Sequence, residues 1–270
     1  MSWNFLEPAS RGNLDMVWRR EADGLLELVS DPALWDDPTA AGHWRVREVV
    51  AHLIHNTEAY LHSFHLTTVD EEPEPLLSVR DMAKNMDAGA QALSGLPRQE
   101  LIDRLQGVLN SMLAVTAELS DKDWTDLLVP HWYMGPVPAS FFPICQALEY
   151  IVHGWDVRKA VPGIRPLDGE AADLLVPLCF LMWPNTSDLD GVKEPFEIGV
   201  RVLGGANAGD TVGKVRPEGI EFVPGDLSGL TVIEFDPAGL VLTAFGRADA
   251  GTVRGSRDLA EKFLNLFFRF

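Results

Sequence analysis

The chain has 270 residues, of which 46% are hydrophobic and 23% charged, a composition typical of globular proteins with a substantial core. Its 40 acidic and 22 basic residues give a net charge of −18, which repels phosphate groups, so neither nucleic acid nor an anionic membrane is expected as a partner. The segment MSWNFLEPAS lacks the basic and apolar regions of a signal peptide, so none is expected. The sequence has no apolar run of membrane-spanning length, and Cys145 and Cys179 form no CxxC pair. A cytoplasmic, reducing location is therefore expected.

The first part of the chain predicts helices. Apolar residues recur at helical spacing in five segments: 11–29, 43–66, 78–96, 98–120 and 139–161. A Pro/Gly/Asp connection at 31–42 and a turn-rich stretch at 130–138 interrupt the pattern. Long amphipathic helices with modest loops are typical of a four-helix bundle, which is the architecture expected for residues 1–165.

The pattern changes near residue 165. A further helix is predicted over 168–183, and an amphipathic helix over 256–270 ends the chain. Between them, four short runs bounded by Gly, Pro or Asp predict strands: 196–204, 219–225, 230–236 and 240–246. Residues 166–270 are thus expected to form a smaller α+β domain with antiparallel strands packed on helices.

The segment ALEYIVHGWDV, Ala147 to Val157, places polar groups at the border of an apolar helix face. Glu149 and His153 are four residues apart, so their side chains lie on the same side of the helix, with Asp156 next to them. A carboxylate and an imidazole so placed can share a metal ion, although two ligands hold a metal poorly. A buried Glu–His hydrogen bond explains the pair equally well.

A third ligand is available on the helix predicted over 43–66. Five residues form its apolar face: Val46, Val49, Leu53, Tyr60 and Phe64. His52 lies at the edge of that face. Four polar residues fall on the opposite side, where a solvated surface is expected: His55, Glu58, His62 and His65. His52 with Glu149 and His153 would make a three-ligand site with an open position, the pattern of catalytic zinc, while iron, nickel and manganese stay open.

Two segments, 43–60 and 147–163, resemble the signatures of the mycothiol-dependent maleylpyruvate isomerase family, which belongs to the DinB-like metalloprotein superfamily. The family patterns W-x-V-x-x-V-x-x-H and E-x-x-x-H-G-x-D fall on these residues: Trp44, Val46, Val49, His52, Glu149, His153, Gly154 and Asp156. The segment 240–267 is similar to the tail of the same family. The resemblance implies a DinB-like metal-binding bundle over 1–165 and a sterol-carrier-protein-like domain over 166–270, with a cleft between them.

The resemblance also implies a chemistry. His52, Glu149 and His153 would bind a divalent metal, usually zinc, whose open position takes the thiol of mycothiol. A metal-bound thiol loses its proton readily. In an isomerase the thiolate adds to an activated cis double bond of a maleylpyruvate-like acid, the bond rotates, and elimination leaves the trans product. Transfer of the thiol to an electrophile starts in the same way, so isomerase and thiol transferase activities are both expected.

Two other functions stay open at this point. One is a metal-dependent hydrolase in which metal-bound water attacks an ester or amide. The other is a non-catalytic protein with a structural metal, whose second domain holds an apolar ligand. The expected partners are a small thiol and an electrophilic or unsaturated acid, and the chain is expected as a monomer or homodimer.

Substrates of this kind carry carboxylates, so arginines are expected near the site. Arg247 resembles a family arginine of the second domain that faces the thiol cofactor, and it is the candidate for both thiol binding and catalysis. Arg80, at the start of the helix 78–96, is the second catalytic candidate. A solvated surface arginine is the alternative for each. Gln146 stands where many relatives have Arg, which leaves the substrate open.

Overall fold

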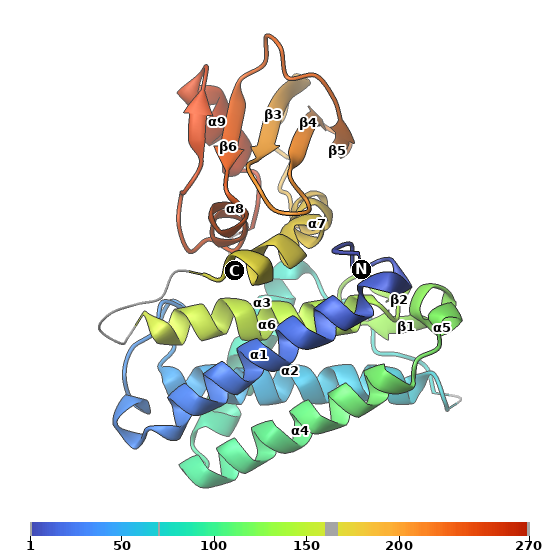
Figure 1. Ribbon diagram of the computed structural model, residues 1–270, viewed down its shortest axis with the longest axis vertical. Helices are drawn as coiled ribbons and strands as arrows, with labels where there is room; N and C mark the ends of the chain where they lie inside the picture. The colour runs from blue at the N-terminus through green and yellow to red at the C-terminus, as the bar shows by residue number, and fades with distance from the viewer. Residues whose placement is uncertain (1, 70, 160–166, 269–270) are drawn as a thin grey trace. The chain divides into compact units, whose positions relative to one another are not determined.

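A computed structural model describes residues 2–69, 71–159 and 167–268. The chain divides into two compact units, Met1–Pro166 and Leu167–Phe270. The first is mainly helical and the second contains a sheet and helices (Figure 1), which confirms the predicted α+β class. Within the described residues, every helix is too short or too polar to cross a membrane.

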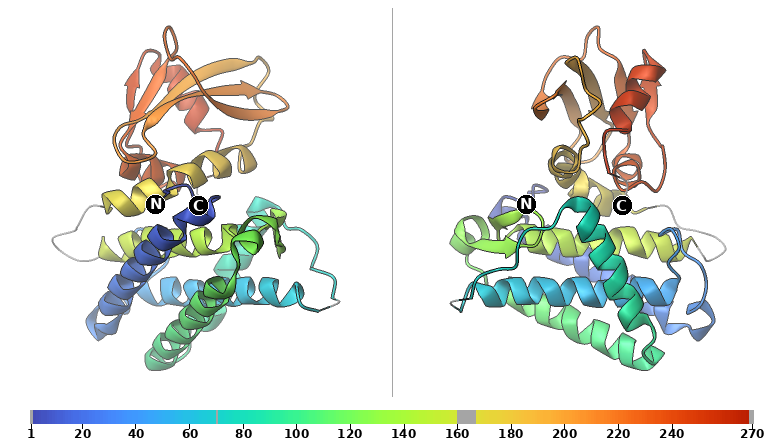
Figure 2. Two further views of the ribbon diagram at one scale, coloured as in Figure 1. Left: turned by 45° about the vertical axis from the view of Figure 1, so that its right-hand side comes forward. Right: turned by 180° about the vertical axis from the view of Figure 1, so that it is seen from behind.

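The described part of the first unit contains four long helices: α1 (Arg11–Ser30), α2 (Val46–Leu66), α4 (Arg98–Glu118) and α6 (Phe141–Arg158). They lie side by side in Figures 1 and 2, with α1 packed on α6 and α2 packed on α4 and α6. A shorter helix, α3 (Val79–Ser94), packs across α2 (Figure 2). This arrangement confirms the expected helical bundle, because the helices meet along the apolar faces that the sequence periodicity indicates.

Shorter elements close the ends of the bundle. They are η1 (Pro8–Ser10), η2 (Pro32–Leu34), α5 (Asp121–Asp126), β1 (Leu128–His131) and β2 (Gly135–Pro138). β1 and β2 form an antiparallel hairpin, with Val129 opposite Val137. The turn-rich stretch predicted at 130–138 thus contains the turn of this hairpin, whereas its two strands were not predicted. Three prolines hid the strand pattern, and a two-stranded hairpin tolerates them because each strand has a free edge.

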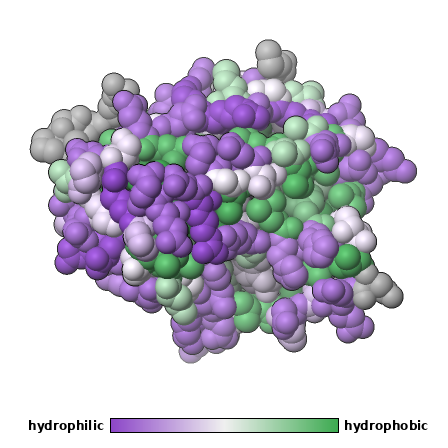
Figure 3. Space-filling model, turned by 90° about the horizontal axis from the view of Figure 1, so that it is seen from below, coloured by the Kyte–Doolittle hydropathy of each residue, from purple (hydrophilic) through white to green (hydrophobic). Residues whose placement is uncertain are grey.

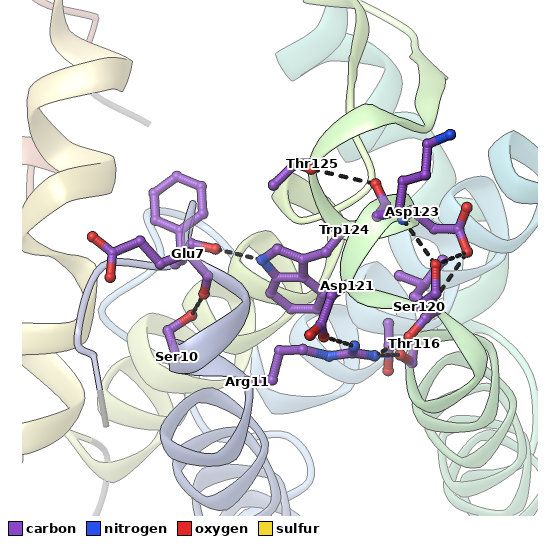
Figure 4. A network of polar contacts seen from close by, with 12 residues as sticks. Glu7, Ser10, Arg11, Thr116, Ser120, Asp121, Asp123, Trp124 and Thr125 are labelled. Carbon is purple, nitrogen blue, oxygen red and sulfur yellow. Dashed lines mark hydrogen bonds and ion pairs between the residues drawn. The ribbon is translucent and has the colours of Figure 1, made fainter.

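Arg11, the first residue of α1, ties the start of that helix to the junction between α4 and α5 (Figure 4). Its guanidinium lies 3.3 Å from Asp121 Oδ1 and donates to the Thr116 carbonyl at 3.2 Å. It also lies 4.9 Å from the centre of the Trp124 ring, whose Nε1 donates to the Phe5 carbonyl at 2.9 Å. A charged side chain thus supplies hydrogen bonds for carbonyls at the end of α4 that have no partner within the helix.

The interface between α2 and α6 positions the predicted site. Three contacts fix its register: His52 with Glu149, Thr57 with Gln146, and Phe64 with Phe142. Later residues of α2 meet earlier residues of α6, so the two helices run antiparallel. This register places the edge of the α2 apolar face directly opposite the polar strip of α6.

The second unit begins with α7 (Gly169–Asn185) and contains, within its described residues, a five-stranded sheet of order β5-β4-β3-β6-β7. The remaining elements are β3 (Phe196–Val202), β4 (Gly209–Arg216), β5 (Gly219–Pro224), β6 (Val232–Phe235), α8 (Pro237–Ala244), β7 (Thr252–Arg254) and α9 (Arg257–Leu264). β3 pairs with β6 in parallel, and the other neighbouring strands are antiparallel. The expectation of a wholly antiparallel sheet was wrong for this one pair.

The segment 240–246 was predicted as a strand, and that prediction was wrong because it lies mostly in α8. The Asp236 side chain accepts a hydrogen bond from the Gly239 amide and Pro237 occupies the first turn, which together begin a helix. A short continuous apolar run looks the same in a buried strand and a buried helix. β4 and β7 were not predicted, since charged residues and glycines interrupt β4 and β7 is only three residues long.

Figure 3 shows one face of the protein coloured by hydropathy. Hydrophilic residues cover most of that face, and apolar residues lie in patches between them. The net charge of −18 repels anionic polymers.

Candidate metal centre

His52 on α2 and Glu149 and His153 on α6 come together within the first unit. One ligand atom from each lies within 4.8 Å of the other two, and this is the one such group of three found among the described residues. The histidines are 5% and 7% exposed, and the Glu149 side chain is 17% exposed. The sequence spacing brings Glu149 and His153 to one side of α6, and the antiparallel register brings His52 opposite them.

Both imidazoles face the same carboxylate oxygen. His52 Nε2 lies 2.9 Å from Glu149 Oε2, and His153 Nε2 lies 3.3 Å from that oxygen. A tetrahedral zinc with ordinary bond lengths keeps its ligand atoms about 3.3 Å apart. The two nitrogens and the oxygen therefore fit a small divalent cation after only a small displacement. One carboxylate and two imidazoles are also the donor types that such cations take.

Asp156 fixes the orientation of one of the two histidines. Its Oδ2 lies 2.9 Å from His153 Nδ1, and Asp156 is fully buried. Nδ1–H donates to this carboxylate, so Nε2 is the ring nitrogen directed toward Glu149. A carboxylate behind a metal-binding histidine is a common arrangement, because it sets the tautomer and makes the imidazole a better ligand.

The electrostatics of the site favour one bound proton in the absence of a cation. Burial by itself would lower the pKa of His153, but the hydrogen bonds with Asp156 and Glu149 raise it to about 9. Burial would raise the pKa of Glu149, yet His52 and His153 hold it well below its usual range. Burial lowers the pKa of His52 despite the attraction of Glu149. His153 thus carries the proton at neutral pH, in a place that a cation can take.

Aromatic and thiol groups surround the cluster. The Trp44 ring lies 4.8 Å from the His52 ring and 5.9 Å from the His153 ring, measured between centres. Burial raises the pKa of Tyr133, with smaller contributions from Cys145 and Glu149. Burial, followed by Glu149, raises the pKa of Cys145 to about 12, so this thiol stays protonated at neutral pH. Sequence patterns did not point to Tyr133, because it lies in the turn of a hairpin that was not predicted.

The other histidines of α2 point away from the cluster. His62 and His65 are exposed, as expected. The expectation of a solvated face was wrong for His55, which is half-buried against Gly89 of α3, and for Glu58, whose carboxylate pairs with Arg104 of α4 at 2.6 and 2.7 Å. These two residues are covered because α3 and α4 pack on that side of α2, and the sequence periodicity of α2 does not show such packing.

The two arginine candidates belong to different units. Arg80 lies exposed in the first turn of α3. Arg247 lies in the second unit after α8, where its Nη1 donates to the Phe245 carbonyl at 2.8 Å. It follows a helix and not the strand that was expected. Neither arginine is part of the cluster of His52, Glu149 and His153, and their roles stay predictions.

Gln146, at the position that departs from the family pattern, is fully buried. Its Oε1 lies 3.1 Å from Thr57 Oγ1, across the α2–α6 interface. The residue thus joins the two ligand helices through an uncharged contact. No positive charge enters the site at this position.

Comparison with known proteins points to one family. A family model described as the mycothiol maleylpyruvate isomerase N-terminal domain matches residues 18–158, more than half of the chain. The crystal structure of the mycothiol-dependent maleylpyruvate isomerase is similar with a TM-score of 0.58 and 17% identity, over 90% of this chain and 92% of that one. The crystal structure of a histidine-to-alanine mutant of that enzyme is similar with a TM-score of 0.59 and 16% identity, again over 90% of this chain and 92% of that one. At this identity the two structures establish the fold. No curated protein matches the chain.

Proposed function

Because the chain belongs to the mycothiol maleylpyruvate isomerase family, we propose that it is an enzyme that depends on a divalent metal and on mycothiol or a similar small thiol. It would isomerise a cis double bond of a maleylpyruvate-like acid, or transfer the thiol to an electrophile. The observation that carries the metal assignment is the convergence of His52, Glu149 and His153 on one buried point. Zinc is the metal that this donor set favours.

Each residue of the proposed centre has a distinct task. His52, Glu149 and His153 would hold the metal, and Asp156 would keep His153 in the tautomer that presents Nε2. When bound, the metal lowers the pKa of a thiol at its open position, so that a nucleophilic thiolate is available at neutral pH. Cys145 does not belong to the group of ligand atoms, and burial raises the pKa of its thiol to about 12 in the metal-free protein. The need for an external thiol agrees with this.

The charged groups of the substrate require cations from the chain. We assign Arg80 and Arg247 to this task, as the residues that bind a substrate carboxylate or the polar groups of the thiol. Gln146 supplies no charge, so the substrate has to be recognised without a cation at that position. We place the enzyme in the cytoplasm, where small thiols are kept reduced, and the two free cysteines are consistent with that.

The metal assignment predicts about one divalent ion per chain. His52→Ala and His153→Ala should each lose most of the bound metal, because two ligands make a poor site. The control is His62→Ala, which removes an exposed imidazole from the same region and should keep the metal. Elemental analysis after dialysis against zinc measures the content. Unchanged metal in both ligand variants would refute the assignment.

The reaction class is tested with metal-loaded protein and a panel of unsaturated acids and electrophiles, with and without mycothiol. Turnover that needs the thiol without consuming it identifies an isomerase. Stoichiometric loss of the thiol identifies a transferase. Turnover of an ester or amide without any thiol would replace the proposal with a metal-dependent hydrolase.

A further inference from the structure

The two histidines of the centre are held in different ways. His153 has a carboxylate behind it, since its Nδ1 lies 2.9 Å from Asp156 Oδ2. His52 has none, because its Nδ1 is buried and has no hydrogen-bond partner among the residues that the structure describes. Metal-binding histidines are normally oriented by a hydrogen bond on the nitrogen that does not bind the metal. Apart from the contact of Nε2 with Glu149, the His52 ring therefore has to be oriented by a group that acts on its faces.

The side chain next to His52 is Trp44. The two ring planes are inclined by 38° with their centres 4.8 Å apart, so the indole covers one face of the imidazole. Trp44 lies just before α2, and its carbonyl accepts hydrogen bonds from the amide and hydroxyl of Thr39 at 3.1 and 2.8 Å. The backbone of Trp44 is thus fixed independently of its side chain.

The indole is itself anchored by α3. Trp44 Nε1 donates to Asp87 Oδ1 at 2.7 Å, a short contact to a charged acceptor. His43 Nε2 lies 2.9 Å from the same oxygen. The hydrogen bond from Trp44 is the main cause that lowers the pKa of Asp87, so the carboxylate is ionised at neutral pH. A chain of contacts therefore runs from α3 through Trp44 to His52.

We propose that Asp87 and Trp44 are positioning residues, which together orient His52 in place of the hydrogen bond that its Nδ1 lacks. With the indole against one face, rotation of the imidazole about its Cβ–Cγ bond is hindered on that side. The hydrogen bond to Asp87 keeps the indole from turning away. This inference rests on the proposed function, because it takes His52 as a metal ligand. It adds two residues of a loop and of α3 to the machinery of the site.

The proposal is tested on the full chain by measuring zinc affinity in competition with a chromophoric chelator. Trp44→Ala and Asp87→Ala should each bind zinc about 10- to 100-fold more weakly, which is the usual effect of removing the group that orients a ligand. Asp87→Asn keeps an acceptor of the same shape and should recover most of the affinity. Asn85→Ala is the matched control, since it removes a contact of α3 with His55 and leaves Trp44 untouched.

Spectroscopy distinguishes a changed orientation of His52 from a loss of zinc affinity that is caused only by loosening of α3. With cobalt in place of zinc, Trp44→Phe and Asp87→Ala should shift the visible absorption bands of the metal, whereas Asn85→Ala should leave them unchanged. The double variant Trp44→Ala/Asp87→Ala should be no weaker than Trp44→Ala alone, because the two residues act through one contact. Zinc affinity within twofold of wild type in both single alanine variants would overturn the inference. Wild-type protein that binds no metal would instead overturn the proposed function.

Discussion

At the scale of single residues, the metal-free site is organised around one proton. Both imidazoles contact the same oxygen of Glu149, and the His153 ring lies between that oxygen and Asp156. Two carboxylates next to one imidazole favour its charged form, whereas His52 faces Glu149 alone and burial keeps it neutral. A divalent cation bound at this point has to displace the proton of His153, so metal binding and proton release are linked.

The first prediction concerns pH. The pKa of His153 is raised to about 9 from an ordinary 6.5, so the proton contributes stability fully below pH 6.5 and this contribution is lost as pH rises through 9. Metal-free protein should therefore become less stable between pH 7 and pH 9, which urea unfolding after chelator treatment measures. Metal uptake at pH 7 should release about one proton, seen by calorimetry in buffers of different ionisation enthalpy.

A variant of the orienting carboxylate serves as the control for this linkage. Asp156→Asn removes one of the two charges that raise the pKa of His153, so proton release on metal binding should decrease at pH 7. Equal stability of the metal-free wild type at pH 7 and pH 9 would show that Asp156 and Glu149 do not raise the pKa of His153.

The sequence predicted these residues to different degrees. Glu149 and His153 share one side of α6 because they are one helical turn apart, and the register of the apolar face of α2 separated His52 from the other histidines. Asp87 could not be found in that way. It contacts Trp44 from a helix 43 residues further along the chain, and nothing in the local pattern of α3 indicates a partner.

At the scale of elements, a glycine lies at the contact between α3 and α2. A methyl group on Gly89 would come within 2.4 Å of the His55 ring. The absence of a side chain at this point lets a half-buried imidazole fill the interface between the helices. Because Asp87 is on the same helix, the fit at Gly89 also bears on how α3 holds Trp44.

The second prediction compares two helical glycines. Gly89→Ala should destabilise the protein by about 1–2 kcal/mol, since overpacking costs more than the roughly 1 kcal/mol that alanine gains in a helix. Gly107→Ala on α4 meets no atom within 4 Å and should stabilise by about 0.5–1 kcal/mol. Thermal and urea unfolding measure both. In a His55→Ala background the penalty at Gly89 should vanish, and its persistence there would show that the clash is not the cause.

The elements themselves could be predicted where periodicity is strong. α1, α2, α4 and α6 follow the helical spacing of apolar residues, and β3, β5 and β6 follow short runs bounded by turn residues. α8 was predicted as a strand because its apolar run is continuous, and the capping residue Asp236 with Pro237 was the signal against it. The direction of β6 relative to β3 depends on the long connection between them, which local patterns do not encode.

At the scale of the whole molecule, the chain joins a helical bundle that carries the proposed metal centre to a unit of different architecture. The change of pattern near residue 165 can be read from the sequence, and the two compact units are Met1–Pro166 and Leu167–Phe270. All three proposed metal ligands belong to the first unit. If the second unit takes part in the chemistry, it does so through a group that is not one of these metal ligands. The family resemblance indicates Arg247 as that group.

The last prediction tests that role with full-length, metal-loaded protein. A charge-assisted contact between a guanidinium and the thiol cofactor contributes about 1.5–3 kcal/mol, so Arg247→Ala should weaken mycothiol binding about 10- to 100-fold. The metal content should stay the same, because Arg247 is not part of the metal centre. Arg247→Lys should recover the affinity only in part, since an ammonium group lacks the planar fork of a guanidinium.

Arg257→Ala is the matched control for this experiment, because it removes an exposed arginine from the same unit. Its mycothiol affinity, measured by calorimetry, should equal that of the wild type. If Arg247→Ala and Arg257→Ala bind the thiol equally well, Arg247 does not belong to the thiol site. Thiol recognition would then have to come from the bundle, where Arg80 on α3 is the cation to test next.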